Sequence, residues 1–224
     1  MNHGMSVEIA SRSVCDLFVS AKHYSRSPSI FWRGFALIED CTVQGVCVFG
    51  QPSPALQQFA FRGRDFSFYE LSRLVVQSKT KNAASFLVGN ALRMLRPTPC
   101  AVVSFADSSM GHCGYVYQAT NWFYTGATVS HDHLYLLDGK ATHPMTLRDM
   151  GITDPMAWAR ANGIETIKPA PKHRYFYFCG NRRDKGHMLD CLAYPFFAYP
   201  KCPPSRYDDG DHLLVRSQPW LFEF

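Results

Sequence analysis

The spacing of hydrophobic residues changes between helical and strand periods along this chain, and these changes predict its elements. The apolar positions between residues 7 and 21 share one helical face, which predicts an amphipathic helix. Two apolar, partly alternating runs at residues 30–38 and 42–50 predict an antiparallel hairpin. A pair of prolines directly after the hairpin ends the sheet at that point, since proline removes a backbone donor.

The centre of the chain predicts a strand, a loop and a helix in succession. Residues 69–77 predict a strand with polar groups in an apolar frame, so Glu70, Ser72 and Arg73 either form an internal network or belong to a site. The helix that follows begins after Asn82, a favourable N-cap residue, and Pro97 ends it.

A second buried strand at residues 101–107 delivers Asp107 to its carboxyl end. Sites in open α/β sheets form at such strand ends. Residues 114–126 then predict a helix with Tyr117 and Tyr124 on one face, a plausible wall for a flat heteroaromatic substrate. Amphipathic packing with the hydroxyls at the rim is the alternative.

The loop before the central helix carries Lys79 and Lys81. Unpaired backbone N–H groups at a helix N-terminus, together with two cations, suit a phosphate or pyrophosphate. The loop lacks the glycines of known phosphate-binding fingerprints, so a solvated turn is the alternative. The positions that we assign to the phosphate of a donor are Lys79, Lys81, Asn82, Ala83 and Ser85.

The C-terminal part of the chain is basic and aromatic. Cations flank the apolar strand at residues 175–178, which predicts contact with a phosphate backbone. An edge hairpin protected by charge is the alternative. We expect a core of residues 1–144 and an extension of residues 145–224 that packs on it and contacts DNA. The basic residues assigned to this contact are Lys172, His173, Arg174, Arg182, Arg183 and Lys185.

Composition and charge narrow the class of protein only slightly. The 224 residues are 46% hydrophobic, and the net charge is +5, which permits a polyanionic partner without requiring one. The 8 cysteines include no pair at CxxC spacing, and the N-terminus is polar, so we expect reduced thiols in a cytoplasmic protein. No apolar run reaches the length of a membrane span.

The predicted order of elements resembles the N-acyltransferase fold of the GNAT superfamily. In that fold a loop cradles the CoA pyrophosphate and the sheet splits beside it. A more specific resemblance covers most of the chain: ELSRL, KNAASFLVG, SFADSSMGHCGYVYQATNW and PKHRYFYF look like motifs of the Mom family, phage DNA-modification proteins related to the acyltransferases. The predicted fold is therefore α+β, with a GNAT-like, mixed and mostly antiparallel sheet flanked by helices, and a basic C-terminal extension.

The resemblance implies a transferase that adds a carbamoylmethyl group to N6 of adenine in double-stranded DNA and shields phage DNA from host restriction. The target base must then leave the stacked duplex. Its N6 is a weak nucleophile, so a positioned base must remove a proton. Asp107 is the first candidate, followed by His23 and His112. The remaining candidates are Ser72, Arg73 and Ser109 for orientation, and Tyr117 and Tyr124 for stacking on the base.

The resemblance does not determine the chemical identity of the group donor. The family's product carries a CH2 group on N6 and an amide beyond it, which simple acetyl transfer does not give. An acyl-CoA and an aminoacyl or glycine-derived donor are both candidates. A bound iron held by His23, Asp107 and His112 is a further option, although no ligand spacing in the sequence indicates it.

Two other functions compete with this one. The first is a GNAT enzyme that acylates a small amine or a protein lysine, and the second is a DNA-binding protein without enzymatic activity. For the DNA-modifying enzyme we expect the cytoplasm of the bacterial host cell and no membrane partner. The sequence does not predict an oligomeric state.

Overall fold

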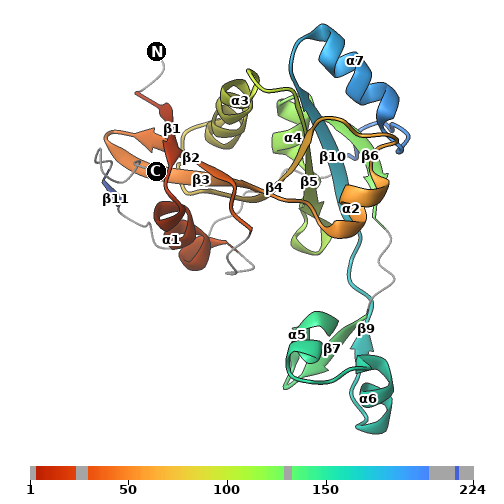
Figure 1. Cartoon of the computed structure of the whole chain (residues 1–224). Helices are drawn as coiled ribbons and strands as arrows, with labels where there is room; N and C mark the ends of the chain where they lie inside the picture. Colours follow the sequence, from red (N-terminus) through yellow and green to blue (C-terminus); the bar gives the residue numbers. More distant parts are fainter. Residues whose placement is uncertain (1–3, 24–29, 129–132, 202–214, 217–224) are drawn as a thin grey trace.

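The computed structural model describes residues 4–23, 30–128, 133–201 and 215–216 as an α+β fold. A large mixed sheet runs in the order β1-β2-β3-β4-β5-β10-β6, and β11 pairs with β3 (Figure 1). Its neighbouring strands are antiparallel except for β4 and β5. The predicted fold class, a mostly antiparallel mixed sheet with flanking helices, is confirmed. The strands are β1 (Ser6–Ala10), β2 (Arg33–Glu39), β3 (Thr42–Gly50), β4 (Ser67–Val76), β5 (Cys100–Asp107), β6 (Phe123–Ala127), β10 (Lys172–Cys179) and β11 (Val215–Arg216).

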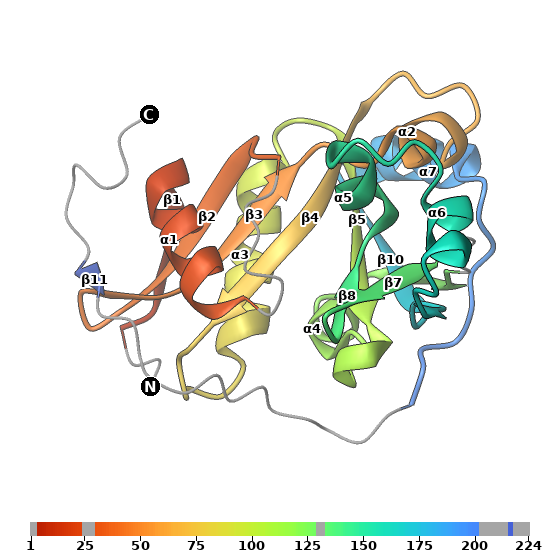
Figure 2. The same ribbon diagram turned by 90° about the horizontal axis from the view of Figure 1, so that it is seen from below.

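Helices cover both faces of this sheet (Figure 2). On one face α3 and α4 enclose the largest core cluster, which includes Leu87 and Trp122. On the other face α1 packs around Val46, and α2 and α7 pack around Phe176. The elements are α1 (Arg12–Lys22), α2 (Pro54–Phe59), α3 (Ala83–Leu95), α4 (Tyr115–Ala119), α7 (Arg182–Cys191) and the 3-10 turn η1 (Ser108–Met110).

The helix predicted over residues 7–21 is wrong at its start, because residues 6–10 form β1. Val7 and Ile9 alternate with polar neighbours, and β1 pairs antiparallel with β2. Ser11 then caps α1, and its side chain accepts from the Val14 N–H at 3.5 Å. A short strand that runs directly into a helix therefore looks like one longer helix in the sequence. The predicted hairpin of β2 and β3 is confirmed.

A bulge in β4 sets the position of Ser72. Across the ladder Val48 pairs with Arg73 and Phe49 pairs with Leu71, so Ser72 is the extra residue on the bulged strand. The Ser72 hydroxyl donates to the Val48 carbonyl oxygen at 3.3 Å. Leu71 consequently packs in the cluster under α3, outside the strict alternation that the sequence predicts.

The sheet splits between β4 and β5, as the acyltransferase resemblance implies. Their parallel pairing ends where Glu70 lies opposite Val103. Beyond this point β4 continues to Val76 and β5 to Asp107 without a shared ladder. The end of β5 that carries Asp107 therefore lies on the split side of the sheet.

The helix predicted over residues 114–126 is mostly wrong. Only Tyr115–Ala119 is helical, and β6 begins at Phe123. Asn121 adopts a left-handed backbone with φ 60°, which ends the helix and turns the chain into the strand. Tyr117 and Tyr124 thus belong to different elements and do not share a helical face.

The strand β10 lies inside the sheet between β5 and β6, so the charged edge hairpin considered as an alternative is wrong. Lys172, His173 and Arg174 form its first residues. Arg182, Arg183 and Lys185 lie instead on α7, after the strand has ended.

A small unit is inserted between β6 and β10 and lies apart from the large sheet (Figure 1). It has its own cluster of buried residues, Tyr135, Leu147 and Ala159. Asp154 caps its second helix. The division of the chain into a core and an extension at residue 144 stays a prediction. The strand β10 follows that position and belongs to the large sheet. The inserted elements are β7 (Leu134–Leu137), β8 (Lys140–Thr142), α5 (Pro144–Asp149), α6 (Pro155–Ala161) and β9 (Thr166–Ile167).

The cysteines do not all carry free thiols. Cys113 is disulfide-bonded, so the expectation of uniformly reduced cysteines is wrong at this position. The other cysteines in the described ranges are free: Cys15, Cys41, Cys47, Cys100, Cys179 and Cys191. Among the described helices, none combines the length and the hydropathy that crossing a membrane requires.

Candidate active site

Ionisable side chains from separate elements converge where β4, β5 and β10 meet the end of α1. The pKa of His23, the C-cap residue of α1, responds to the charges of Arg73, His112 and Lys172. The pKa of Glu70 responds to Arg73 and Lys172. These residues are far apart in the sequence, so the fold alone brings them together. A group of ionisable residues in which neighbouring charges shift the pKa values of the histidines and carboxylates is a candidate functional site.

Asp107 ends β5, as predicted. Hydrogen bonds and an ion pair engage both oxygens of its carboxylate. The Ser109 backbone N–H and hydroxyl donate to Oδ1 at 3.0 Å and 2.6 Å, and Lys172 Nζ lies 3.4 Å from Oδ2. Burial raises the pKa of Asp107, but the hydrogen bonds from Ser109 and the charge of Lys172 outweigh it, and the net pKa lies below the ordinary value. The structure therefore brings together three predicted site residues and makes Asp107 a firmly ionised anchor.

The two histidines of the group are neutral at physiological pH. Burial, followed by the charges of Arg73, His112 and Lys172, lowers the pKa of His23 to about 4. Burial also lowers the pKa of His112, while Asp107 opposes that shift. Neutral imidazoles can accept a proton, so both remain candidates for acid–base chemistry.

Glu70 also belongs to this group, although the sequence does not indicate a catalytic role for it. It occupies the last paired position of β4 before the split. Burial raises the pKa of its carboxyl group, against the opposing charges of Arg73 and Lys172. The signal in the sequence was a carboxylate inside an apolar strand. Its burial and its neighbours come only from the fold.

A chain of hydroxyl groups bridges the split. Ser104 Oγ lies 2.7 Å from the Leu71 carbonyl oxygen and 2.7 Å from the Tyr117 hydroxyl. A carbonyl oxygen can only accept, so Ser104 uses its one proton on Leu71 and accepts from Tyr117. Tyr117, a predicted site residue, therefore contributes its hydroxyl to the split rather than a stacking face to solvent.

Tyr124 of β6, Arg174 of β10 and Phe197 line a groove at the edge of the sheet. The groove has a volume of about 720 Å³, and it lies between β6 and the segment of residues 195–200. Tyr124 donates to or accepts from His173 Nδ1 at 2.9 Å, so these two predicted DNA contacts lie together. Arg174 lines the groove as well, stacks on Tyr194 with its Cζ 3.4 Å from the ring centre, and donates to Thr125.

Hydrogen bonds to a carboxylate fix the loop that is predicted to bind donor phosphate. Glu39, at the end of β2, accepts hydrogen bonds from Ser78 at 2.6 Å and from Thr80. Lys79 and Lys81 are exposed. Asn82 occupies the predicted N-cap position of α3, but its backbone is left-handed and its side chain makes no capping bond. The N-terminus of α3 therefore has no side-chain cap.

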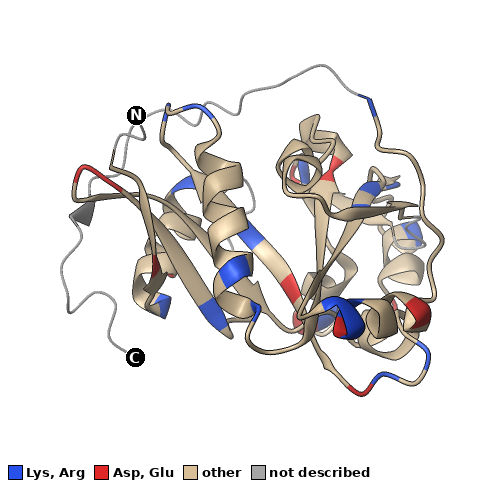
Figure 3. Cartoon of the chain, turned by 90° about the horizontal axis from the view of Figure 1, so that it is seen from above, with Lys and Arg blue, Asp and Glu red and all other residues tan. Residues whose placement is uncertain are grey.

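The cations do not form one basic face. In Figure 3 Lys and Arg are spread over many described elements and are interspersed with Asp and Glu. Arg182 and Arg183 are exposed on α7, in a different element from the ionisable group. Across the described ranges, no three His, Cys, Asp or Glu side chains are placed to hold a metal ion. The iron considered for His23, Asp107 and His112 therefore has no support from this geometry.

The split sheet and the ionisable group beside it define a candidate group-transfer enzyme. The chain belongs to the Mom protein family, which it matches over residues 4–201. One relative is the methylcarbamoylase Mom of Escherichia phage Mu, which is 30% identical over 141 residues. The match covers 60% of this chain and 56% of that relative, so the chain spans little more than half of the relative's length.

Solved acetyltransferases show a distant likeness. An N-acetyltransferase from Staphylococcus aureus Mu50 has a TM-score of 0.44 at 13% identity, over 78% of this chain and 98% of that chain. A spermidine/spermine N-acetyltransferase from Vibrio cholerae has a TM-score of 0.45 at 8% identity, over 83% and 98%. Scores this low carry no argument about function.

Proposed function

We propose that this chain is a DNA-modifying transferase that adds a carbamoylmethyl group to N6 of adenine in double-stranded DNA. It thereby protects phage DNA from restriction, in the cytoplasm of the bacterial host. Membership of the Mom family and the name of the phage Mu relative support the class of reaction. The structural observation that carries the proposal is the convergence of His23, Glu70, Arg73, Asp107, His112 and Lys172 beside the split between β4 and β5.

The two carboxylates of the site have different roles. Asp107 has a lowered pKa and is paired with Lys172 and Ser109, so it is a weak base and a good anchor. Glu70 has a raised pKa and lies at the mouth of the split. A carboxylate with a raised pKa is better matched to removing a proton near neutral pH. We therefore assign proton removal from N6 to Glu70 and orientation of the site to Asp107.

The groove at the edge of β6 is the proposed place for the extruded adenine. Tyr124 and Phe197 supply aromatic surface, and Arg174 supplies a guanidinium group. Aromatic and guanidinium planes bind an unstacked base without the rest of the duplex. Arg174 and Lys172 lie two residues apart on β10, so the groove leads toward the Lys172–Asp107 pair.

The split and the N-terminus of α3 are the proposed place for the donor. The uncapped helix end with Lys79 and Lys81 suits the charged part of a donor. The split, bridged by Ser104 and Tyr117, suits its uncharged arm. The donor is an activated acyl or aminoacyl compound, and both kinds fit this division into a charged and an uncharged end.

Mass spectrometry of nucleosides from the DNA of expressing cells tests the proposal. We expect modified deoxyadenosine with the wild-type chain and none with Asp107→Ala or Glu70→Gln. Acyl transfer to a small amine or to protein lysine without a DNA adduct would instead identify an ordinary acyltransferase. Salt-sensitive DNA binding without any nucleoside change would identify a binding protein.

A further inference from the structure

The indole N–H of Trp122 is a buried donor without a hydrogen-bond partner. Within the described part of the chain, it is the one buried side-chain nitrogen or oxygen left unpaired. Trp122 is only 1% exposed, so bulk water does not reach this group. Leaving a buried donor unpaired is costly, and native proteins seldom do so without a reason.

The backbone of Trp122 is fixed from several directions. Its N–H donates to the Tyr117 carbonyl oxygen at 3.0 Å, and its own carbonyl oxygen accepts from the Tyr199 hydroxyl at 2.6 Å. The preceding Asn121 is in the left-handed region. The ring packs against Tyr117 and Tyr177, with centres 5.0 Å and 5.6 Å away. The direction of the indole N–H is therefore imposed by the fold.

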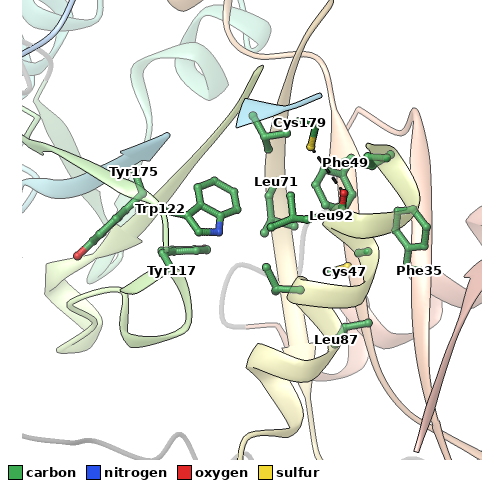
Figure 4. Packing of buried hydrophobic residues seen from close by; sticks show 14 of the residues in the cluster. Phe35, Cys47, Phe49, Leu71, Leu87, Leu92, Tyr117, Trp122, Tyr175 and Cys179 are labelled. Carbon is green, nitrogen blue, oxygen red and sulfur yellow. Dashed lines mark hydrogen bonds between the residues drawn. The ribbon is translucent and has the colours of Figure 1, made fainter. Parts of the chain in front are cut away.

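The unpaired donor lies next to the bridge across the split. The ring of Tyr117 contacts Trp122, and the Tyr117 hydroxyl is hydrogen-bonded to Ser104. Ser104 donates in turn to the Leu71 carbonyl oxygen of β4. In Figure 4 Trp122 lies between Tyr175 and Leu71 and next to Tyr117. Trp122, Tyr117 and Leu71 share one buried cluster, so the unpaired nitrogen lies near the residues that bridge the split.

The surroundings determine the kind of acceptor. Trp122 belongs to the apolar cluster that includes Leu71 and Leu92. Moving a charged oxygen into such a cluster is far more costly than moving a carbonyl oxygen. A phosphate or carboxylate is therefore excluded, and an uncharged carbonyl oxygen fits.

We propose that Trp122 binds the activated donor, and that its indole N–H donates a hydrogen bond to the carbonyl oxygen of the group to be transferred. This assignment rests on the proposed function, because it requires a carbonyl-bearing donor in the split between β4 and β5. It gives Trp122 a binding role in addition to its packing role.

The test compares two ligands and two variants by isothermal titration calorimetry. Acetyl-CoA has a thioester carbonyl, whereas S-ethyl-CoA is a thioether of the same shape without that oxygen. Trp122→Phe keeps an aromatic ring and removes the N–H. We expect it to bind acetyl-CoA roughly 3- to 10-fold more weakly than the wild-type chain, the worth of one net hydrogen bond. Its affinity for S-ethyl-CoA should be unchanged. Trp158→Phe, in the inserted unit, is the matched control and should change neither affinity.

A second readout follows the indole group directly. In a protein labelled with ¹⁵N-tryptophan, the indole proton signal that Trp122→Phe removes should move downfield with acetyl-CoA and stay in place with S-ethyl-CoA. Equal weakening of both ligands in Trp122→Phe would show a packing effect and overturn the assignment. So would an unmoved signal, or a wild-type chain that binds neither ligand.

Failure of this assignment and failure of the proposed function are distinguishable. If wild-type cells contain modified deoxyadenosine while Trp122→Phe behaves as the wild type, only the role of Trp122 is lost. If wild-type cells contain no modified deoxyadenosine, the proposed function is lost, whatever Trp122 binds.

Discussion

Lys172 Nζ lies 3.4 Å from Asp107 Oδ2, and the two residues lie directly opposite each other where β10 and β5 pair. The sequence assigns Lys172 to a DNA-backbone contact and Asp107 to the chemistry. The sheet register joins the two assignments, because it places the cation of one strand on the carboxylate of the other. Lys172 is therefore part of the candidate active site and lies beside the groove proposed for the base.

The first prediction concerns this pair. Lys172→Met should reduce adduct formation about 10-fold or more, because Asp107 loses the cation that lowers its pKa and its orientation is released. DNA affinity should change little. Quantitative nucleoside mass spectrometry and a DNA-binding titration at fixed salt measure the two effects. Lys185→Met on α7 is the control for loss of one charge. A variant of Lys172 with normal adduct yield and weakened DNA binding would return this residue to the phosphate-contact role.

The sequence predicts the elements well where one period runs on without interruption. The hairpin, β4, α3 and β5 with Asp107 at its end are all predicted and observed. The errors occur where the period changes within a few residues, as at β1–α1 and at α4–β6. Ser11 and Asn121 decide those changes through local capping and a left-handed backbone, which hydrophobic spacing does not reveal.

The site is harder to predict than the fold because it depends on distant contacts. The sequence indicates Asp107, Ser109 and Lys172 separately, and only the register of β5 against β10 brings them together. The role of Glu70 depends on its burial, and the unpaired N–H of Trp122 depends on what surrounds it. Neither quantity is present in a single sequence.

The second prediction separates Glu70 from Asp107 by pH. If Glu70 removes the proton, it must be ionised, so activity should fall as the pH drops through its raised pKa. Glu70→Gln should lower the rate about 100-fold or more and abolish this acidic limb. Asp107→Asn should lower the rate but leave the limb where it is. If the fall in activity at acidic pH persists in Glu70→Gln, another ionisable group is responsible for it.

The same residue gives a prediction about stability. A carboxyl group whose pKa is raised on folding binds more protons in the folded than in the unfolded state, so its contribution to stability is lost as the pH rises through the folded pKa. Glu70→Gln should therefore raise the melting temperature at pH 8 more than at pH 4. Glu8→Gln, on β1, is the control carboxamide. An equal change in melting temperature at pH 8 and pH 4 would show that ionisation of Glu70 does not destabilise the fold.

Another prediction concerns two glycines near the site. Gly114 and Gly111 both have a positive φ, at 80° and 69°. A Cβ at Gly114 would lie 2.5 Å from Tyr175 Cε2, whereas a Cβ at Gly111 meets nothing within 4 Å. Gly111→Ala should cost only the backbone strain, about 1–2 kcal/mol. Gly114→Ala should cost about 2–5 kcal/mol, because the overpacked Tyr175 adds to that strain. Chemical denaturation measures both, and equal costs would contradict the contact.

A prediction about Phe197 tests the groove. Phe197 is 56% exposed, its ring lies over Gly126, and its backbone N–H donates to the Tyr124 carbonyl oxygen at 2.9 Å. Phe197→Ala should weaken binding of a duplex with an unpaired adenine about 10-fold, the worth of one stacked base. The fluorescence of 2-aminopurine at that position reports whether the base is stacked in the groove. Phe59→Ala, at a site that is 62% exposed on α2, is the matched control and should bind normally.

The last prediction separates the two groups of cations. Lys79 and Lys81 precede the uncapped end of α3, and Arg182 and Arg183 open α7. Replacing either pair with Glu changes the net charge by the same amount, so a general electrostatic effect would be equal in both variants. We expect Lys79→Glu with Lys81→Glu to raise the donor concentration needed for half-maximal transfer and to leave DNA affinity nearly unchanged. The charge reversal on α7 should weaken DNA binding and leave the donor concentration needed for half-maximal transfer nearly unchanged. It should also reduce the salt dependence of DNA binding if these arginines contact phosphates. Equal loss of DNA affinity in both variants would mean that the loop before α3 binds the DNA backbone rather than the donor.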